Sequence, residues 1–198
     1  MADNHPTIYL ARHGETEWSL SGQHTGLTDI PLTARGERNA RELGTRLKGL
    51  KFSHVLVSPL QRARRTCELA GFGDQAVVDP DLVEWNYGAY EGKTSDEIHR
   101  LRPGWNVFRD GGPGGESPAD VRARADRVIA RLRDLGHEAL VFSSGHFLRV
   151  MGARWCRLDV TVGEALYLST AALSEVGYEH TIESPVIRLW NDCRHVEA

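Results

Sequence analysis

The stretch ALVFSSGHFLRV, residues 139–150, decides the fold of this chain. Its first five residues are almost continuously apolar, and they run into the small residues Ser144 and Gly145. A strand that is covered on one face alternates apolar and polar side chains, whereas a continuous apolar strand is typical of a parallel sheet with helices on both faces. Residues 146–157 follow with a helical pattern. The stretch therefore predicts an α/β unit.

The rest of the chain repeats this alternation. We expect further strands at 7–11, 54–58 and 75–79, helices from Thr33 to about Gly49, from Pro59 onward and over 117–135, and two or three strands within 165–190. This order predicts a three-layer α/β/α fold whose mostly parallel central sheet is flanked by helices on both faces. We expect one domain, 1–198, with loops at 12–32, 80–93 and 103–117 and a loop-rich lid at about 80–117.

Composition narrows the classes of partner. The 198 residues are 40% hydrophobic and 26% charged, with a net charge of -3, which does not favour nucleic acid or an anionic membrane as a partner. Neither a signal peptide nor a membrane-spanning run is evident. The irregularly spaced Cys67, Cys156 and Cys193 indicate reduced thiols in a cytoplasmic protein. No C-x-x-C pair occurs, so we expect no structural metal, and no motif calls for a cofactor.

The triplet Arg12-His13-Gly14 comes directly after the first strand. Arginine presents a planar fork of donors that suits phosphate, and glycine lets the main chain approach a ligand closely. A neutral imidazole can attack phosphorus and become a phosphohistidine. Taken alone, the triplet is weak evidence for this chemistry and fits better a hydrogen-bonded histidine at a strand end.

Two further segments carry charge at strand ends. In SPLQRARRT, residues 58–66, Arg62 lies one turn into a helix, where anions are favoured, while we expect Arg64 and Arg65 to form a solvated face. In LVEWNYGAYEG, residues 82–92, Glu84 lies among aromatic residues and suits a general acid. We expect Glu91 to be a surface carboxylate.

Together these segments resemble the histidine phosphatase superfamily, the phosphoglycerate mutase-like proteins. The resemblance covers most of the chain and includes, in order, RHGETEW, TGLTDIPLT-RG, SPLQRA--T, L-E--YG-YEG, GGES and S-GH--R. It implies a phosphoglycerate mutase-like fold, a phosphomonoesterase (hydrolase) activity without a metal, and a small phosphorylated metabolite as partner. The single pieces are common, but the ordered set is specific.

The resemblance also implies roles for residues. His13 is the nucleophile, Arg12 and Arg62 clamp the phosphate, and Glu84 donates a proton to the leaving group and later activates water. Two guanidinium groups would also lower the pKa of His13 and keep it neutral. Further substrate or phosphate contacts are expected from Ser19, Gln23, Thr25, Gly26, Tyr87, Trp105, Arg109, Ser144, Gly145 and His146.

One position departs from the family. The last motif normally reads Ser-His-Gly, and its histidine is usually a cation facing the phosphoryl oxygens, but here Ser144 takes that place. Serine can donate one hydrogen bond and supplies no charge. Three explanations stay open: a natural residue with catalysis sustained by His13, the arginines and His146; an engineered substitution that slows turnover; or a weakly active or inactive phospho-ligand binder.

Chain length helps to separate phosphatase from mutase. Mutases of this family carry an insertion after the glutamate motif, whereas Gly92 and Glu116 here lie only 24 positions apart. A short lid leaves the phosphohistidine open to water, which favours hydrolysis. The segment RPGWNVFRDGGPGGES resembles members that act on sugar phosphates, including sedoheptulose-bisphosphatase-like ones, with Trp105, Asn106 and Arg109 toward the distal pocket. The oligomeric state stays open, and the tail strands offer an edge for a homo-oligomer.

Overall fold

A six-stranded sheet forms the centre of the molecule. The computed structural model describes residues 5–196. The strands are β1 (Ile8–Arg12), β2 (His54–Val57), β3 (Ala76–Val78), β4 (Ala139–Ser143), β5 (Leu173–Tyr178) and β6 (Pro185–Asp192), in the spatial order β3-β2-β4-β1-β5-β6. The β1–β4, β2–β3 and β2–β4 ladders are parallel, and β5 and β6 add antiparallel pairings. The mostly parallel sheet expected from the sequence is confirmed.

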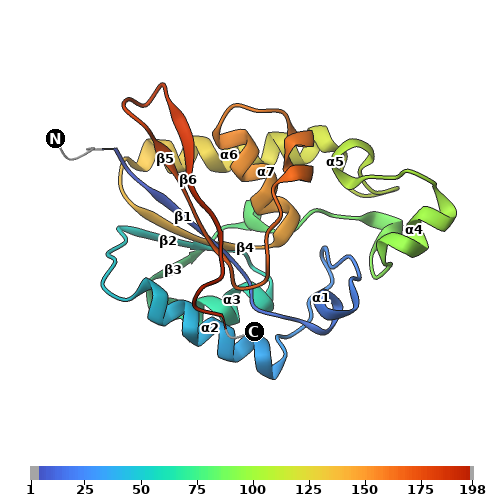
Figure 1. The fold of residues 1–198 in the computed structure, drawn as a ribbon, viewed down its shortest axis with the longest axis horizontal. Helices are drawn as coiled ribbons and strands as arrows, with labels where there is room; N and C mark the ends of the chain where they lie inside the picture. The colour runs from blue at the N-terminus through green and yellow to red at the C-terminus, as the bar shows by residue number, and fades with distance from the viewer. Residues whose placement is uncertain (1–4, 197–198) are drawn as a thin grey trace.

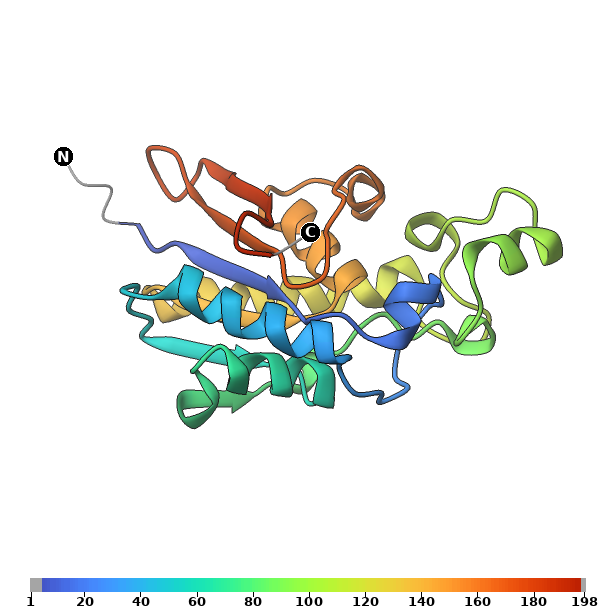
Figure 2. The same ribbon diagram turned by 60° about the horizontal axis from the view of Figure 1, so that its bottom comes forward.

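Helices cover both faces of this sheet. One layer contains α2 (Ala34–Leu47) and α3 (Gln61–Leu69), and the other contains α6 (Pro118–Leu135) and α7 (Gly145–Trp155) (Figures 1 and 2). Every residue of β4 is buried. Leu140 and Phe142 pack in the core beneath α2 and α3, whereas Ala139 and Val141 pack in the core beneath α6 and α7. The continuous apolar run therefore fills two cores, which confirms the three-layer architecture.

Polar caps fix where the long helices begin. Thr33 caps α2 by accepting the Gly36 N–H, and Ser117 forms a capping box with Asp120 before Pro118 opens α6. The expectation that Pro59 opens α3 is wrong by two residues, because the helix begins at Gln61. The reason is external to the helix: the Asp29 carboxylate accepts the Gln61 N–H at 2.8 Å and caps this end from another loop.

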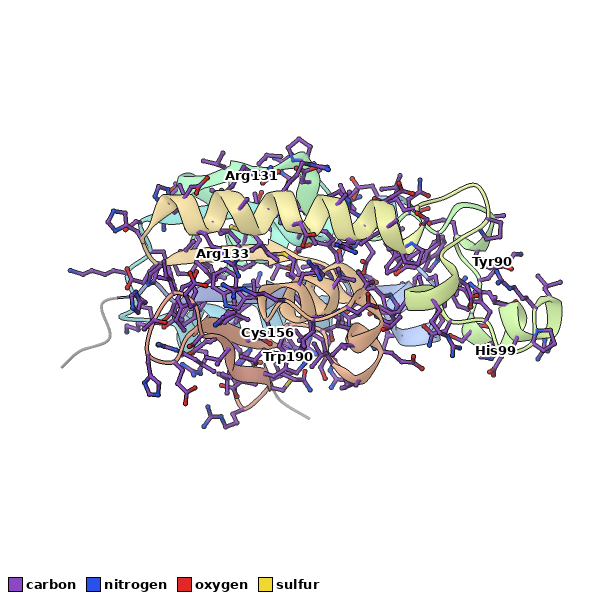
Figure 3. The ribbon with its side chains drawn as sticks, turned by 90° about the horizontal axis from the view of Figure 1, so that it is seen from above. Tyr90, His99, Arg131, Arg133, Cys156 and Trp190 are labelled. Carbon is purple, nitrogen blue, oxygen red and sulfur yellow. The ribbon has the colours of Figure 1, made fainter. Side chains whose placement is uncertain are left out.

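The loop expected at 12–32 and the lid expected at about 80–117 contain short helices. These are α1 (Glu17–Ser21), α4 (Ser95–Leu101), α5 (Val107–Asp110) and the 3-10 turns η2 (Pro80–Leu82) and η3 (Gly88–Tyr90). Two further 3-10 turns, η1 (Gly73–Gln75) and η4 (Val160–Ala165), lie before β3 and after α7. Local capping boxes, Thr16 with Ser19 and Thr94 with Glu97, start α1 and α4. The part with α4 and α5 projects from one end of the molecule, where Tyr90 and His99 lie beyond α6 (Figure 3).

The topology sets where a site can form. The carboxyl ends of the parallel strands β1, β2 and β4 meet at one edge of the sheet, next to α1 and the projecting part (Figure 1). In open α/β sheets ligands bind beyond these carboxyl ends. None of the helices formed by the described residues is both long and apolar enough to cross a membrane.

Candidate active site

His13 lies immediately after β1, and only 4% of it is exposed. Its main-chain N–H donates to the Ser143 carbonyl of β4 at 3.0 Å, which fixes it against the neighbouring strand. Its Nδ1 lies 2.7 Å from the Gly14 carbonyl oxygen. Because a carbonyl oxygen can only accept, Nδ1 carries the hydrogen and Nε2 of the neutral ring keeps its lone pair. The structure therefore leaves Nε2 with a free lone pair, which is what an attacking atom needs.

Two arginines adjoin this histidine: Arg62, which is fully buried, and Arg12, which is partly buried. The Arg12 Nη1 donates to the Leu168 carbonyl at 2.5 Å. Arg62, in the first turn of α3, donates to the carbonyl oxygens of Thr25, Gly26 and Thr28 at 2.8–3.1 Å. In both side chains Nε is buried and has no hydrogen-bond partner among the described residues. A buried donor without a partner is costly, so these two Nε–H groups fit an anion such as phosphate.

The same surroundings set the protonation state of His13. Burial, together with the positive charges of Arg62 and Arg12, lowers the pKa of His13 well below its usual value of 6.5. The sequence led us to expect this direction from the two guanidinium groups, and the structure adds burial as the larger cause. A lowered pKa leaves His13 neutral, and therefore nucleophilic, across the physiological pH range.

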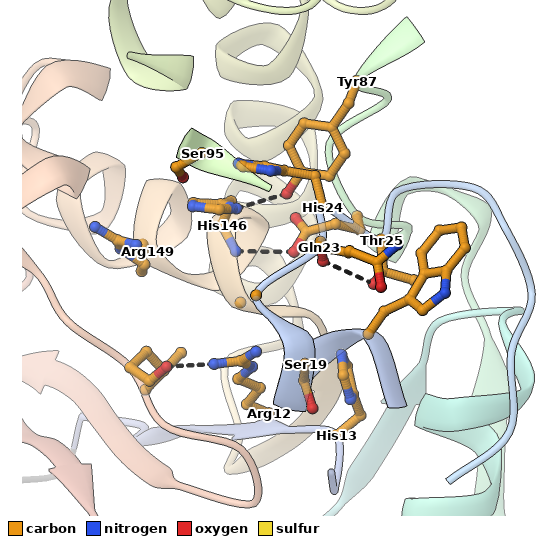
Figure 4. Close-up of a pocket in the computed structure, with 15 residues that line it drawn as sticks. Arg12, His13, Ser19, Gln23, His24, Thr25, Tyr87, Ser95, His146 and Arg149 are labelled. Atoms are coloured by element: carbon orange, nitrogen blue, oxygen red, sulfur yellow. Dashed lines mark hydrogen bonds between the residues drawn. The ribbon is translucent and has the colours of Figure 1, made fainter. Parts of the chain in front are cut away.

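Glu84 sits against the N-terminus of α7. Its Oε1 accepts the N–H groups of Trp85 and Phe147, both at 2.8 Å, and its Oε2 accepts the N–H of His146 at 2.9 Å. Figure 4 shows the Oε2 contact in the wall of the cleft. A carboxyl oxygen has two lone pairs, so Oε1 is fully used and Oε2 retains one. Oε2 is therefore the atom at which Glu84 can exchange a proton with a ligand.

The glutamate of the GGES motif supports the Glu84 segment. Glu116 holds Arg124 through two hydrogen bonds of 2.9 and 2.8 Å. Arg124 in turn donates to the carbonyl oxygens of Val83, at 2.7 Å, and Glu84, at 3.2 Å. Glu116 also accepts the Asn86 N–H at 2.9 Å. The motif thus fixes the main chain on both sides of Glu84 without reaching the cleft itself.

Glu91 differs from the surface carboxylate that we expected. Its Oε1 accepts the N–H groups of Gly26 and Thr28, at 2.7 and 3.1 Å. The carbonyl oxygens of these same two residues accept from Arg62. The sequence could not reveal this contact, because the 22–28 loop and Glu91 are brought together by long-range contacts, such as the pairing of Gln23 with Thr94. Glu91 therefore supports the loop whose carbonyl oxygens hold Arg62.

Ser144 occupies the N-cap of α7 and is fully buried. Its Oγ forms no hydrogen bond with any described residue. The adjacent Ser143 is paired in register with Arg12, which places the start of α7 beside the Arg12-His13 pair. A Cβ at Gly145 would lie 3.1 Å from the Arg12 guanidinium, so a larger residue there would require Arg12 to shift by a few tenths of an ångström. Ser144 therefore offers a free hydroxyl, with no charge, between two residues that adjoin Arg12.

Arg12, His13, Glu84 and Gly145 border a cleft of about 220 Å³. The predicted site residues that line it are Arg12, His13, Ser19, Gln23, Thr25, Glu84, Tyr87, Gly145 and His146 (Figure 4). The Tyr87 hydroxyl lies 2.5 Å from the His146 Nδ1. Burial raises the pKa of Tyr87 well above 10 and lowers the pKa of His146 well below 6.5. This pair is therefore neutral and contributes hydrogen bonds rather than charge.

Other predicted residues do not line this cleft. Arg62, Gly26 and Ser144 belong to the shell around His13 described above. Trp105 packs edge-on against His24 and donates to the Gly111 carbonyl, so it anchors the projecting segment. Arg109 is not part of the distal cleft: it donates to the Gly104 carbonyl and lines a separate hollow beside Pro118 and Arg122. The one-turn helix α5 buries Phe108 and leaves the next side chain, Arg109, on its outer face.

Six residues that line the cleft went unpredicted: Trp18, Gly22, His24, Ser95, Arg149 and Leu168. The His24 ring lies parallel to the His146 ring with centroids 5.9 Å apart, and burial lowers its pKa. Arg149 is four residues after Gly145, so it lies one helical turn along α7 on the same face. That spacing is a signal in the sequence, because the motif S-GH--R contains this arginine. Within residues 5–196, no three His, Cys, Asp or Glu side chains group closely enough to hold a metal ion.

Comparison with known proteins fits this geometry. Residues 8–193 match the model of the histidine phosphatase superfamily (branch 1), and the chain belongs to this family. It is 38% identical over 179 residues to an acid phosphatase of Mycobacterium tuberculosis, with 88% of each chain covered. It is 37% identical over 187 residues to sedoheptulose 1,7-bisphosphatase of Saccharomyces cerevisiae, covering 78% of this chain and 69% of the yeast protein.

Further relatives bear other names. A probable phosphoglycerate mutase of Escherichia coli is 31% identical over 204 residues, covering 96% of this chain and 95% of its own. Among solved structures, that of the open reading frame Rv3214 of Mycobacterium tuberculosis superposes with a TM-score of 0.89 at 36% identity, covering 94% of this chain and 97% of its own. These matches establish the phosphoglycerate mutase-like fold.

Proposed function

We propose that this protein is a phosphomonoesterase that hydrolyses small phosphorylated metabolites, in particular sugar phosphates, through a phosphohistidine on His13. The observation that carries the proposal is the state of His13: a buried, neutral imidazole whose Nε2 is free, between two arginines with unpartnered Nε–H groups. This arrangement combines a nucleophile with fixed positive charge for a phosphate dianion. The names of the two relatives that are 37–38% identical support hydrolysis.

The first chemical step follows from these positions. His13 Nε2 attacks phosphorus, and an N–P bond forms as the bond from phosphorus to the ester oxygen breaks. The leaving oxygen takes the proton from Glu84 Oε2, the carboxyl oxygen with spare capacity. Arg12 and Arg62 bind the equatorial oxygens, where negative charge is held in the transition state. The products are the phosphohistidine, an ionised Glu84 and the free alcohol.

The second step regenerates the enzyme. Glu84 Oε2 accepts a proton from water, the water oxygen attacks phosphorus, and the N–P bond breaks. Its electron pair returns to His13 Nε2, and inorganic phosphate leaves with Glu84 protonated again. Ser144 donates one neutral hydrogen bond where relatives of this family usually hold a cation, so we expect turnover below that of members with a histidine there.

The cleft also supports a polyhydroxylated substrate with more than one anionic group. Arg149 lies in the cleft wall; its Nε and Nη2 donate to the carbonyl oxygens of Gly163 and Glu164, and its guanidinium stacks on Phe108 at 4.6 Å. This places a fixed cation one helical turn from the phosphate-binding end. The aromatic rings of Trp18, His24 and Tyr87 provide the remaining wall, which suits the apolar face of a sugar.

A mutase is the second candidate, favoured by the 31% identity to the probable phosphoglycerate mutase. The deciding experiment is a panel of sugar phosphates and bisphosphates, phosphoglycerates and nucleotides, scored both for released phosphate and for positional isomers. We expect free phosphate from sugar phosphates. Isomerised phosphoglycerate with little free phosphate would establish the mutase instead.

A phospho-ligand binder is the third candidate function, and it is favoured by Ser144, which supplies no positive charge. After rapid mixing with substrate at mildly acidic pH, mass spectrometry should detect one added phosphoryl group, mapped to His13. It should be absent in His13→Asn and present in His180→Asn, a control at an exposed histidine. If the protein binds phosphate tightly but forms no phosphoryl adduct at any time and releases no product, it is a phospho-ligand binder and not an enzyme.

A further inference from the structure

One loop supports both residues at the phosphate-binding end of β1. This segment, 168–172, connects η4 to β5. The Leu168 carbonyl accepts from the Arg12 guanidinium, and the Ala172 carbonyl accepts the Arg12 N–H at 3.1 Å. The Ala171 N–H donates to the His13 carbonyl at 3.0 Å. The position of the nucleophile therefore depends on the conformation of residue 171.

That conformation is an unfavourable one. Ala171 is fully buried and has a φ of 56°, in the left-handed region that residues other than glycine rarely adopt. A non-glycine residue persists there only when its surroundings hold it. Strain of this kind at the neighbour of a nucleophile points to a group that fixes the loop from outside.

His195 supplies such a group. Its ring Nε2 lies 2.9 Å from the Ala171 carbonyl oxygen, and since a carbonyl only accepts, Nε2–H is the donor. The ring lines a hollow with Glu42 and Thr45 of α2. His195 lies two residues beyond the end of the family match at residue 193. The same end of the chain supports the loop a second time, because the Asn191 Oδ1 accepts the Ser169 N–H at 2.7 Å.

We propose that His195 is a positioning residue: it locks Ala171 in its left-handed conformation and thereby aligns His13 for attack on phosphorus. The effect passes from the His195 Nε2–H to the Ala171 carbonyl, and from the Ala171 N–H to the His13 carbonyl. The inference concerns the rate of phosphoryl transfer and so rests on the proposed function. It assigns a catalytic consequence to the C-terminal segment, which does not reach the cleft.

The test uses four variants of the full chain: His195→Ala, His195→Gln, Ala171→Gly and the double variant Ala171→Gly/His195→Ala. Loss of the donor should lower kcat about tenfold with little change in KM, because misplacing a nucleophile affects the chemical step. Glutamine carries an N–H donor and should restore most of kcat. Glycine adopts positive φ without strain, so in the Ala171→Gly background the removal of His195 should cost much less than tenfold.

Two readouts report on the loop without any turnover. In His195→Ala, amide hydrogen exchange of Ala171 should quicken, and affinity for orthovanadate, a phosphate analogue, should fall. If the wild type releases no phosphate and forms no phosphohistidine, the proposed function fails, and these readouts still test the positioning role. The positioning role of His195 is overturned if His195→Ala has the kcat of the wild type or if hydrogen exchange at Ala171 is unchanged. It is also overturned if the effects of the two substitutions on kcat are fully additive.

Discussion

At the scale of single residues, the site depends on which atoms lack partners. The unpartnered Nε atoms of Arg12 and Arg62 and the free hydroxyl of Ser144 cluster around a histidine whose Nδ1 is already committed. The sequence predicted the identity of these residues from their order in the motifs. It could not predict their hydrogen bonds, because each partner comes from a distant segment, such as Leu168 for Arg12 and the 25–28 loop for Arg62.

The Ser144→His substitution tests the cost of the missing cation. A charge-assisted hydrogen bond contributes roughly 1.5–3 kcal/mol, so we expect the substitution to raise kcat about 10- to 100-fold. The measurement is the hydrolysis of p-nitrophenyl phosphate by both proteins, with Ser144→Ala as a control that removes the hydroxyl without adding charge. Equal turnover by wild type and Ser144→His would mean that a cation at this position is unimportant here.

The lowered pKa of His13 makes a prediction about the pH dependence of activity. Because His13 stays neutral below its usual pKa of 6.5, the acid limb of kcat/KM should lie below pH 6.5. Two substrates with different phosphate pKa values separate this limb from ionisation of the substrate. An inflection at pH 6.5 or above for both substrates would contradict the assignment of His13 as a buried nucleophile.

At the scale of elements, strand ends and helix starts bring the site together. Periodicity predicted the strands and the long helices because each buries an apolar face, and this signal is local. Periodicity did not predict the short helices α1, α4 and α5, because they are only five, seven and four residues long. Their starts depend on capping by Thr16, Thr94 and Asn106 rather than on an apolar stripe.

Glu91, at the end of η3, contacts the loop that contains Gly26 and Thr28, and its removal has a defined consequence. In Glu91→Ala the N–H groups of Gly26 and Thr28 lose their acceptor, so the loop that holds Arg62 should loosen. We expect orthovanadate affinity to fall about tenfold, since hydrogen bonds to a charged group contribute roughly 1.5–3 kcal/mol each. Isothermal titration calorimetry measures this, with Glu179→Ala as the control at an exposed carboxylate. Unchanged affinity would mean that the loop is held without Glu91.

A substitution at the N-cap of α6 should change the stability of the protein without changing the candidate active site. Ser117→Ala removes the capping box with Asp120 and should lower the free energy of unfolding by about 1 kcal/mol. Urea unfolding followed by circular dichroism measures the change, with Ser53→Ala as the control at an exposed serine outside any cap. A loss in kcat as large as that of a site variant would show that α6 does more than support the fold.

At the scale of the whole molecule, burial of neutral histidines couples stability to pH. The pKa values of His13, His24 and His146 are lowered in the folded protein, chiefly by burial. Below about pH 6.5 the unfolded chain therefore binds more protons than the folded one, so the free energy of unfolding falls as the pH falls. Above that pH neither state binds these protons, so the three histidines do not make the free energy of unfolding depend on pH.

Urea unfolding at pH 7.5 and pH 5.5 measures this coupling. We expect a lower midpoint at pH 5.5, and a smaller difference between the two pH values in His146→Asn than in wild type. His180→Asn, at an exposed histidine, should leave the difference unchanged. A midpoint that is the same at both pH values would contradict the burial of neutral histidines.

The sequence by itself determined the layered α/β fold and the family, and it predicted which residues would form the site, because apolar periodicity and motif order are local properties of the chain. Only the tertiary structure decided which carbonyl fixes the His13 tautomer, that Glu91 supports the Arg62 loop, that Arg109 lies outside the cleft while Arg149 lies in it, and that His195 contacts the strained Ala171. These depend on contacts between segments far apart in the sequence. Such contacts exist only once two cores have packed against the sheet and brought the strand ends to one edge.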